Sequence, residues 1–307
     1  MMLKRFALAV LCILGPGFSA NAATFTTFDP PGSTDTRGFS INGLGSIAGD
    51  YRDSNSVVHG FVRAADGTIT EFDPPGSTDT DASSINGTGA IAGSYKAKHV
   101  WHGYVRAVDG TITTFDPPGS TGIFVASIND KGSIAGDYSD ANDIVHGFVR
   151  AADGTITTFD PKGSTGTFAA SINDAGTVTG SFDRNGNSRG YVRAVDGTIT
   201  VFDPSGSDDT KARTINGKGS IAGDYTDNTG FHGFVRATDG TITTFDAPGS
   251  VVTDALSINT KGSIAGAYTA NYHRWHGFVR AADGTIKAFD YPESKSTVAV
   301  SINSTHS

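Results

Sequence analysis

The residues FVASINDKGSIAGDYSDANDIVHGFVRAADGTITTFD run from Phe124 to Asp160 and decide the fold. Within them, four short strand candidates span residues 124–128, 133–138, 146–151 and 155–159, and turn residues such as Asn, Asp and Gly separate these candidates. Segments of this length between turn residues are typical of β-strands, and none of them resembles a helix. The stretch therefore predicts one unit of four β-strands.

This unit recurs along nearly the whole chain. Its third strand begins with His-Gly-Phe/Tyr-Val-Arg, which starts at His59, His102, His146, His232 and His276, with a sixth copy at Arg189. Its first strand ends with Ser/Thr-Ile-Asn, at Asn42, Asn86, Asn129, Asn173, Asn216, Asn259 and Asn303. Its fourth strand ends with Phe-Asp, which starts at Phe28, Phe72, Phe115, Phe159, Phe202, Phe245 and Phe289. A period of 43 or 44 residues in each of these markers is typical of a repeat architecture.

The Asp-Gly pair between the third and fourth strands, as in Asp66-Gly67, occurs in all six units. It predicts a two-residue type I′ hairpin, whose two positive φ angles suit Asp followed by Gly. Counting outward from such a turn would place Phe61 opposite Phe72 on the neighbouring strand, and would place the next arginine, Arg63, opposite a threonine.

The Asn-x-x-Gly motif between the first and second strands, as in Asn129 to Gly132, predicts a second turn. In this turn the asparagine caps the backbone and the glycine adopts a left-handed conformation.

Repeated four-stranded units of this length predict an all-β fold, a β-propeller of four-stranded blades. One unit cannot bury both of its faces alone, so neighbouring units stack around an axis. Six blades, from about Gly38 to Asp290, are favoured, and a strand near residues 24–29 or one near 297–303 then closes the ring. The alternative is seven blades, in which both terminal strands build a seventh, incomplete blade.

The N-terminal residues 1–22 read as a secretory signal peptide, followed by a single repeat domain over residues 23–307. Lys4 and Arg5 precede an apolar run, and Ala20-Asn21-Ala22 is a small-residue cleavage site. The apolar run is too short to span a bilayer. We therefore expect a secreted or periplasmic protein without a membrane span.

Charge and cysteine content narrow the possible partners. Cys12, the only cysteine, lies in the signal, and loss of Lys4 and Arg5 takes the formal charge from -8 to -10. Such a charge argues against nucleic acid and anionic lipid as partners. Neutral polar ligands or cations fit better.

The Ile-Asn-x-x-Gly turn followed by His-Gly-Phe resembles the bacterial extracellular repeat proteins of the HAF family, which carry His-Ala-Phe at the same place. The resemblance covers about Gly38 to Asp290. It departs from the family in having Gly for Ala, and Arg189 for His in the fourth unit. It implies secretion and repeated β structure, and it transfers no catalytic residue.

Residues that recur in every unit are expected to serve the fold. The motif histidines could form a metal ring, but packing between blades with hydrogen bonds to backbone is the favoured interpretation. The arginines at the end of the motif are expected to pair with the Phe-Asp aspartate or to lie on a phenylalanine ring. They occur at Arg63, Arg106, Arg150, Arg193, Arg236 and Arg280.

One end of the propeller is expected to collect polar loops, because the second-to-third and fourth-to-first connections emerge together. Its acids would include Asp50, Asp53, Asp137, Asp140, Asp143, Asp183, Asp224 and Asp227. Calcium is the cofactor that such acids suggest, although no loop has the complete EF-hand ligand pattern. Solvated turn residues explain most of these acids, and no cofactor is predicted.

Two loops break the acidic pattern and are the predicted ligand-binding site. They contribute Lys98, His99 and Trp101 from the second unit, and Tyr272, His273, Arg274 and Trp275 from the sixth. Aromatic faces beside hydrogen-bonding groups suit a sugar. In a closed six-bladed ring, both units would flank the first. The alternative is that the two tryptophans are only packing residues that replace Val58, Val145 and Phe231 of other units.

The favoured function is an exported, non-catalytic binding or interaction module for extracellular polysaccharide or another surface component. One alternative is a glycan-acting hydrolase or lyase, because two of the many carboxylates could act as acid and base in one cleft. Another is a purely structural envelope or matrix protein. No motif selects a catalytic pair, so no catalytic residue is predicted.

Overall fold

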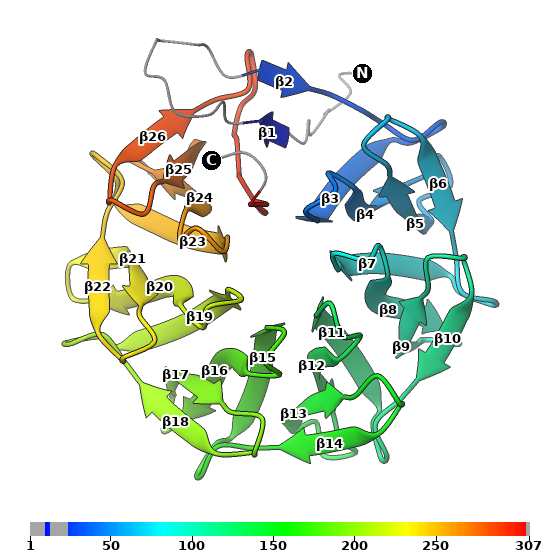
Figure 1. Ribbon diagram of the computed structural model, residues 1–307, viewed down its shortest axis with the longest axis horizontal. Helices are drawn as coiled ribbons and strands as arrows, with labels where there is room; N and C mark the ends of the chain where they lie inside the picture. Colours follow the sequence, from blue (N-terminus) through cyan, green and yellow to red (C-terminus); the bar gives the residue numbers. More distant parts are fainter. Residues whose placement is uncertain (1–9, 13–23, 305–307) are drawn as a thin grey trace.

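The computed structural model describes residues 10–12 and 24–304, and in them it contains only β-strands and the turns between them. Six units of four strands are arranged in a ring (Figure 1). The predicted all-β propeller of four-stranded units is confirmed. Apart from residues 10–12, the predicted signal peptide lies outside the described residues. No helix in the described part of the chain is long and apolar enough to cross a membrane.

The strands of the units follow one another in chain order. The first two units comprise β3 (Asp35–Ile41), β4 (Ile47–Arg52), β5 (Val58–Arg63), β6 (Ile69–Phe72), β7 (Asp79–Ile85), β8 (Ile91–Ala97), β9 (Val100–Arg106) and β10 (Ile112–Phe115). The next two comprise β11 (Gly122–Ile128), β12 (Ile134–Ser139), β13 (Val145–Arg150), β14 (Ile156–Phe159), β15 (Gly166–Ile172), β16 (Val178–Arg184), β17 (Asn187–Arg193) and β18 (Ile199–Phe202). The last two comprise β19 (Asp209–Ile215), β20 (Ile221–Asp227), β21 (Gly230–Arg236), β22 (Ile242–Phe245), β23 (Val252–Ile258), β24 (Ile264–Thr269), β25 (Trp275–Arg280) and β26 (Ile286–Phe289).

Each unit is an antiparallel meander whose first strand lies nearest the ring axis and whose fourth strand lies at the rim (Figure 1). Single parallel bridges, Val58 to Asp79 and Phe231 to Val252, join the first unit to the second and the fifth to the sixth. Apolar clusters form between neighbours: Ala92 of the second unit packs with Ile123, Val125 and Phe148 of the third. Neighbouring units therefore share their cores, as stacking around an axis requires.

The Asn-x-x-Gly turn has the predicted geometry. The Asn129 side-chain Oδ1 accepts hydrogen bonds from the backbone N–H groups of Lys131 (3.1 Å) and Ser133 (2.8 Å). Gly132 has a φ of 82°, in the left-handed region that favours glycine.

The Asp-Gly hairpin differs from the prediction. Ala64 and Thr68 are joined by a backbone hydrogen bond of 2.8 Å, and the Gly67 N–H returns to the Ala64 carbonyl. Gly67 has a positive φ and Asp66 does not. The connection is therefore a three-residue loop, a type I turn followed by a left-handed glycine, and the type I′ assignment was wrong.

That extra loop residue shifts the strand register by one. Phe72 lies opposite Gly60 rather than Phe61, and Arg63 lies opposite Ile69 rather than Thr70. The register also explains the glycine of His-Gly-Phe. In the third unit, a Cβ added to Gly147 would lie 2.7 Å from the Phe159 ring. The ring occupies the space that an alanine methyl group would need.

Seven asparagines form a closed ring of hydrogen bonds around the axis. The Nδ2 of each donates to the backbone carbonyl of the next at 2.8 to 3.3 Å, in the order Asn42, Asn86, Asn129, Asn173, Asn216, Asn259, Asn303 and back to Asn42. Six of them belong to the four-stranded units. Asn303 belongs to the C-terminal segment.

Both terminal segments lie between the sixth unit and the first (Figure 1). From the N-terminal side, β1 (Val10–Cys12) pairs with β2 (Thr24–Thr26), and Phe28 then packs edge-on against Phe61. From the C-terminal side, the Thr297 N–H donates to the Trp275 carbonyl at 2.9 Å. The two termini thus share one place in the ring, which the alternative of an incomplete blade requires.

We expect Asn303→Ala and Asn173→Ala both to destabilise the fold. Each change removes an amide whose Nδ2 donates to the next carbonyl of the asparagine ring, and should lower the unfolding free energy by about 1–3 kcal/mol. Urea denaturation of both variants measures this. If Asn303→Ala had no effect while Asn173→Ala was destabilising, the C-terminal segment would not be part of the closure.

Candidate functional site

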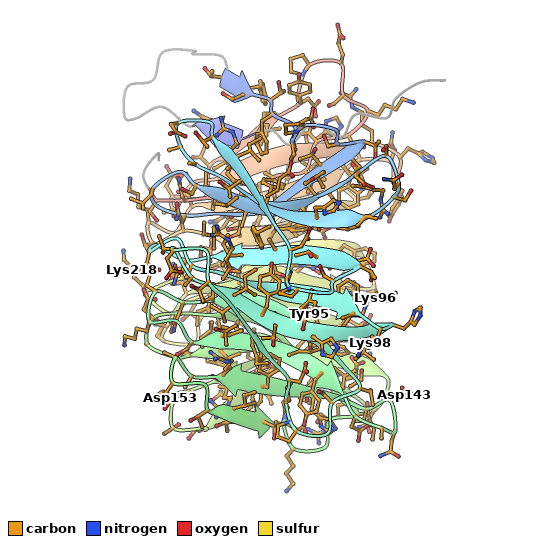
Figure 2. The ribbon with its side chains drawn as sticks, turned by 90° about the vertical axis from the view of Figure 1, so that its right-hand side faces the viewer. Tyr95, Lys96, Lys98, Asp143, Asp153 and Lys218 are labelled. Atoms are coloured by element: carbon orange, nitrogen blue, oxygen red, sulfur yellow. The ribbon has the colours of Figure 1, made fainter. Side chains whose placement is uncertain are left out.

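The loops at the two ends of the propeller differ in origin. Figure 2 shows Lys98 and Asp143, from second-to-third connections, and Lys96, near the end of β8, at one end, and Asp153 and Lys218 at the other. Second-to-third connections of different units therefore lie at the same end, as expected.

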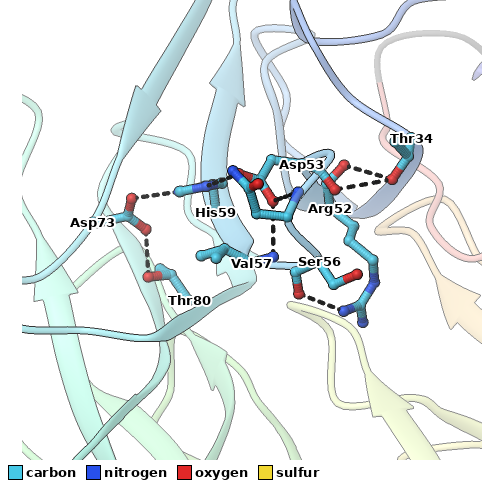
Figure 3. Close-up of polar contacts among 9 residues, drawn as sticks. Thr34, Arg52, Asp53, Ser56, Val57, His59, Asp73 and Thr80 are labelled. Atoms are coloured by element: carbon cyan, nitrogen blue, oxygen red, sulfur yellow. Dashed lines mark hydrogen bonds and ion pairs between the residues drawn. The ribbon is translucent and has the colours of Figure 1, made fainter.

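At this end, the repeated histidines join one unit to the next. In Figure 3, His59 Nδ1 bonds to Asp73 at 2.7 Å, and the other oxygen of Asp73 accepts a hydrogen bond of 2.5 Å from Thr80 of the following unit. The His59 ring stacks on Tyr51, with centroids 5.1 Å apart. Arg189 takes this place in the fourth unit and lies 3.5 Å from Asp203. The expectation of a packing role fits, but the partner is a carboxylate rather than backbone.

The repeated arginines lie on phenylalanine rings. The Arg106 guanidinium carbon lies 4.9 Å from the ring centroid of Phe72, which belongs to the outer strand of the preceding unit. The same contact recurs in every unit, at Arg63, Arg106, Arg150, Arg193, Arg236 and Arg280. Two contacts were expected for these arginines, an ion pair with the Phe-Asp aspartate or packing on a phenylalanine ring, and the ring contact is the one found. The aspartate bonds to histidine instead.

Most of the loop acids stabilise their own turns. Asp53 Oδ1 accepts hydrogen bonds from the N–H groups of Asn55 and Val57, both at 2.8 Å, and Asp140 does the same in the third unit. Among the described residues, no three His, Cys, Asp or Glu side chains are placed to hold a metal ion.

The two loops of the predicted sugar site lie on opposite sides of the first unit and the terminal segments (Figure 1), and no contact in the described structure joins them. Lys98 and His99 form the two-residue turn between β8 and β9, with φ angles of 49° and 69°, and Trp101 pairs with Lys96. The two loops were expected to lie close together because a six-bladed ring would place the second and sixth units on either side of the first. In the structure, the terminal segments lie between the sixth unit and the first (Figure 1).

The sixth-unit loop holds the C-terminal segment. The Trp275 N–H donates to Ser296 Oγ at 3.2 Å, and Arg274 pairs with Asp290 at 3.2 Å. The His273 N–H donates to Asn271 within the loop. Tyr272 remains 63% exposed.

The strongest departures from the repeat lie beside the axis. Asp50, Asp137 and Asp224 occupy equivalent positions in β4, β12 and β20, so they are strand residues and not loop acids as predicted. The units between them have Ser94, Ser181 and, in the sixth, Ala267. Alignment of the residue after Ile-Ala-Gly across the units would have revealed this alternation.

We call Asp50, Asp137 and Asp224 the axial aspartates. In the first unit, the axial aspartate Asp50 is paired with an arginine of the same unit. Arg37 lies opposite Asp50 in the register and makes two hydrogen bonds to its carboxylate, at 2.8 and 3.0 Å. Burial raises the pKa of Asp50 to about 7, against the opposing effect of Arg37, and a hydrogen bond with Asp81 of the next unit contributes. Burial also raises the pKa of the Asp81 carboxyl.

The fifth unit repeats this arrangement with another arginine. Lys211 lies opposite Asp224, and Arg213, from the bulge in β19, hydrogen-bonds to both oxygens of Asp224. Asp254 of the next unit takes the place of Asp81, and burial raises the pKa of its carboxyl.

The third unit has phenylalanines in place of these charges. Phe124 lies opposite Asp137, and Phe168 of the next unit takes the place of Asp81. These rings are 53% and 38% exposed. Among the described residues, none forms a side-chain hydrogen bond or ion pair with Asp137, and burial raises the pKa of its carboxyl to about 7.

Comparisons with known proteins agree on the fold. No protein-family model and no curated protein matches this sequence. The β-propeller domain of the Trilobed protease from Pyrococcus furiosus is similar in structure, with a TM-score of 0.63 at 10% identity over 83% of this chain and 84% of that one. Virginiamycin B lyase from Staphylococcus aureus gives 0.59 at 14% identity over 84% and 85%. TolB from Acinetobacter baumannii gives 0.56 at 13% identity over 84% and 67%. These likenesses show the β-propeller fold.

Thr167→Val should test the link between units. Thr167 is fully buried, and its hydroxyl donates to Asp160, which also holds His146. Loss of this donor leaves the shape intact and should lower the unfolding free energy by about 1–3 kcal/mol. Thr157→Val, at an exposed strand position of the neighbouring unit, is the matched control. Equal effects of the two changes in urea denaturation would refute the link.

Asp137→Asn should remove a pH-dependent cost. The native pKa of Asp137, about 7, lies above the unfolded value of about 3.9, so native protein holds a proton between these values that unfolded chain releases. The contribution of Asp137 to stability therefore falls as pH rises from 4 to 7. Relative to wild type, the variant should gain about 1–3 kcal/mol at pH 8 and less at pH 5. Urea denaturation at both pH values measures this, with Asp143→Asn in an exposed turn as control; an equal gain at both would contradict the assignment.

Proposed function

We propose that this protein is an exported, non-catalytic binding module that recognises a saccharide of an extracellular polysaccharide or surface component at its axis. The observation that carries the proposal is the pair of exposed phenylalanines, Phe124 and Phe168, on the inner strands beside the half-buried Asp137. Ring faces stack on the C–H groups of a sugar, and a carboxylate accepts hydrogen bonds from its hydroxyls. The rest of the unit repeats its residues for packing, whereas Phe124 and Phe168 stand where other units have charged residues.

As part of this proposal, the two terminal segments form an incomplete seventh blade that closes the propeller, so the ring is not closed by the six complete blades alone. Two observations support the seventh place. The asparagine ring has seven members, and Asn303 is the seventh. Arg63 lies 5.0 Å from the Phe28 ring, as Arg106 lies over Phe72. An additional place widens the ring, so the inner strands expose side chains at the axis.

The alternative of a glycan hydrolase or lyase has one feature in its favour, the raised pKa of the two interacting carboxyl groups of Asp50 and Asp81. Two carboxyl groups of this kind resemble an acid and base pair. However, Asp50 is only 1% exposed and is held by Arg37, so it has no surface with which to reach a glycosidic bond. Binding without cleavage is therefore the better supported function.

Screening the protein against bacterial and plant polysaccharides, with assay of the bound glycans for cleavage, tests this proposal. Phe124→Ala or Phe168→Ala should weaken binding of a captured glycan about tenfold, because each removes one stacking face worth roughly 1–2 kcal/mol. Phe231→Ala is the matched control, since Phe231 is 43% exposed but lies in a third strand away from the axis.

The screen also separates the alternatives. Released products would establish an enzyme. Loss of binding in Trp101→Ala or Trp275→Ala, with the axial variants unaffected, would return the site to the loops. If the protein bound no glycan, the remaining alternative would be a purely structural role in the envelope or matrix.

A further inference from the structure

Asp50, Asp137 and Asp224 occupy the same position in three different units. Two of them form an ion pair with an arginine side chain of the same chain. Asp50 is paired with the guanidinium group of Arg37, and Asp224 with that of Arg213. The chain itself therefore demonstrates which chemical group this position accepts. Only at Asp137 does the described structure provide no cation.

The surroundings of Asp137 are built like those of its equivalents. The hydroxyl of Tyr191 donates to the Phe168 carbonyl at 3.3 Å, just as that of Tyr104 donates to the Asp81 carbonyl at 3.1 Å. The charges of Asp137 and of Asp81 raise the pKa of these respective tyrosines, to which burial is the larger contribution. Asp137 therefore lies near Phe168 as Asp50 lies near Asp81.

The change from charged residues to phenylalanines keeps the position suited to a cation. Where the first unit has Arg37 and Asp81, the third and fourth have Phe124 and Phe168, whose ring faces attract positive charge. A cation between these rings would gain both the ring contacts and the carboxylate. Among the described residues, the lack of any group of three acids or histidines argues against a metal ion here.

We propose that Asp137, Phe124 and Phe168 bind the protonated amino group of an amino sugar in the saccharide ligand. This inference rests on the proposed function and names its substrate class. The amine would take the place that Arg37 and Arg213 fill in the equivalent positions, and the sugar ring would lie against the phenyl rings. A neutral N-acetylated sugar offers no charge to the carboxylate.

Calorimetric titration with a glucosamine hexamer and with its uncharged N-acetylated counterpart tests the proposal. Wild type should bind the free amine at least about tenfold more tightly than the acetylated hexamer, and Asp137→Asn should remove this preference. Asp143→Asn makes the same charge change in an exposed turn and should keep the preference.

A second measurement uses an N-trimethylated hexamer, whose charge does not change with pH. Its binding to wild type should tighten as pH rises from 5.5 to 7.5, because only the ionised carboxylate attracts the cation. Asp137→Asn should bind it weakly at every pH.

The outcomes separate the two proposals. If both hexamers bound equally well and Phe124→Ala bound neither, recognition of the amino group would be refuted, while the proposed binding of a saccharide at the axis would be supported. A preference for the amine that survives in Asp137→Asn would overturn the role of this carboxylate. Failure of both hexamers to bind would overturn the amino-sugar inference, and the polysaccharide screen with Phe124→Ala would then decide the axial saccharide site separately.

Discussion

The asparagine at the end of each inner strand is the interaction on which the rest of the ring depends. Its Oδ1 holds the turn of its own unit, and its Nδ2 reaches the backbone of the next. One side chain therefore sets both the end of a strand and the distance to the neighbouring unit. Because the bonds close on themselves through Asn303 and Asn42, the number of units is coupled to the position of the C-terminal segment.

Outside the asparagine ring, the units are held together by contacts of the repeated histidines and arginines. His59 is engaged by Asp73, and Arg106 by Phe72, so the motif that marks the repeat has little left for a ligand. Positions that do not serve these contacts are free to vary. The axis is where such variation is concentrated, with Arg37, Phe124 and Lys211 at one equivalent position.

Local patterns predicted the units, their strands and the Asn129 turn, because these depend on residues close in sequence. The hairpin at Asp66-Gly67 failed because Asp-Gly suits two loop lengths, and only packing of Phe72 over Gly60 selects one. The pairing of Trp101 with Trp275 relied on a blade count that no local pattern determines. Asp137 lies within the strand predicted over residues 133–138, yet its side chain was counted among the loop acids of the polar end, because the strand pattern does not show which neighbour a side chain faces.

The alternation of Asp50, Ser94, Asp137, Ser181 and Asp224 divides the axial positions into sets. Tyr104 and Tyr191 alternate with Phe61, Phe148 and Phe234 over the same five units, and the sixth unit departs with Ala267 and Phe278. Each pair of neighbouring units carries one axial set, such as Phe124, Asp137 and Phe168. None of these side chains belongs to the asparagine ring. The axial surface and the closure of the ring therefore depend on separate residues, so substitutions can change the first while the second is kept.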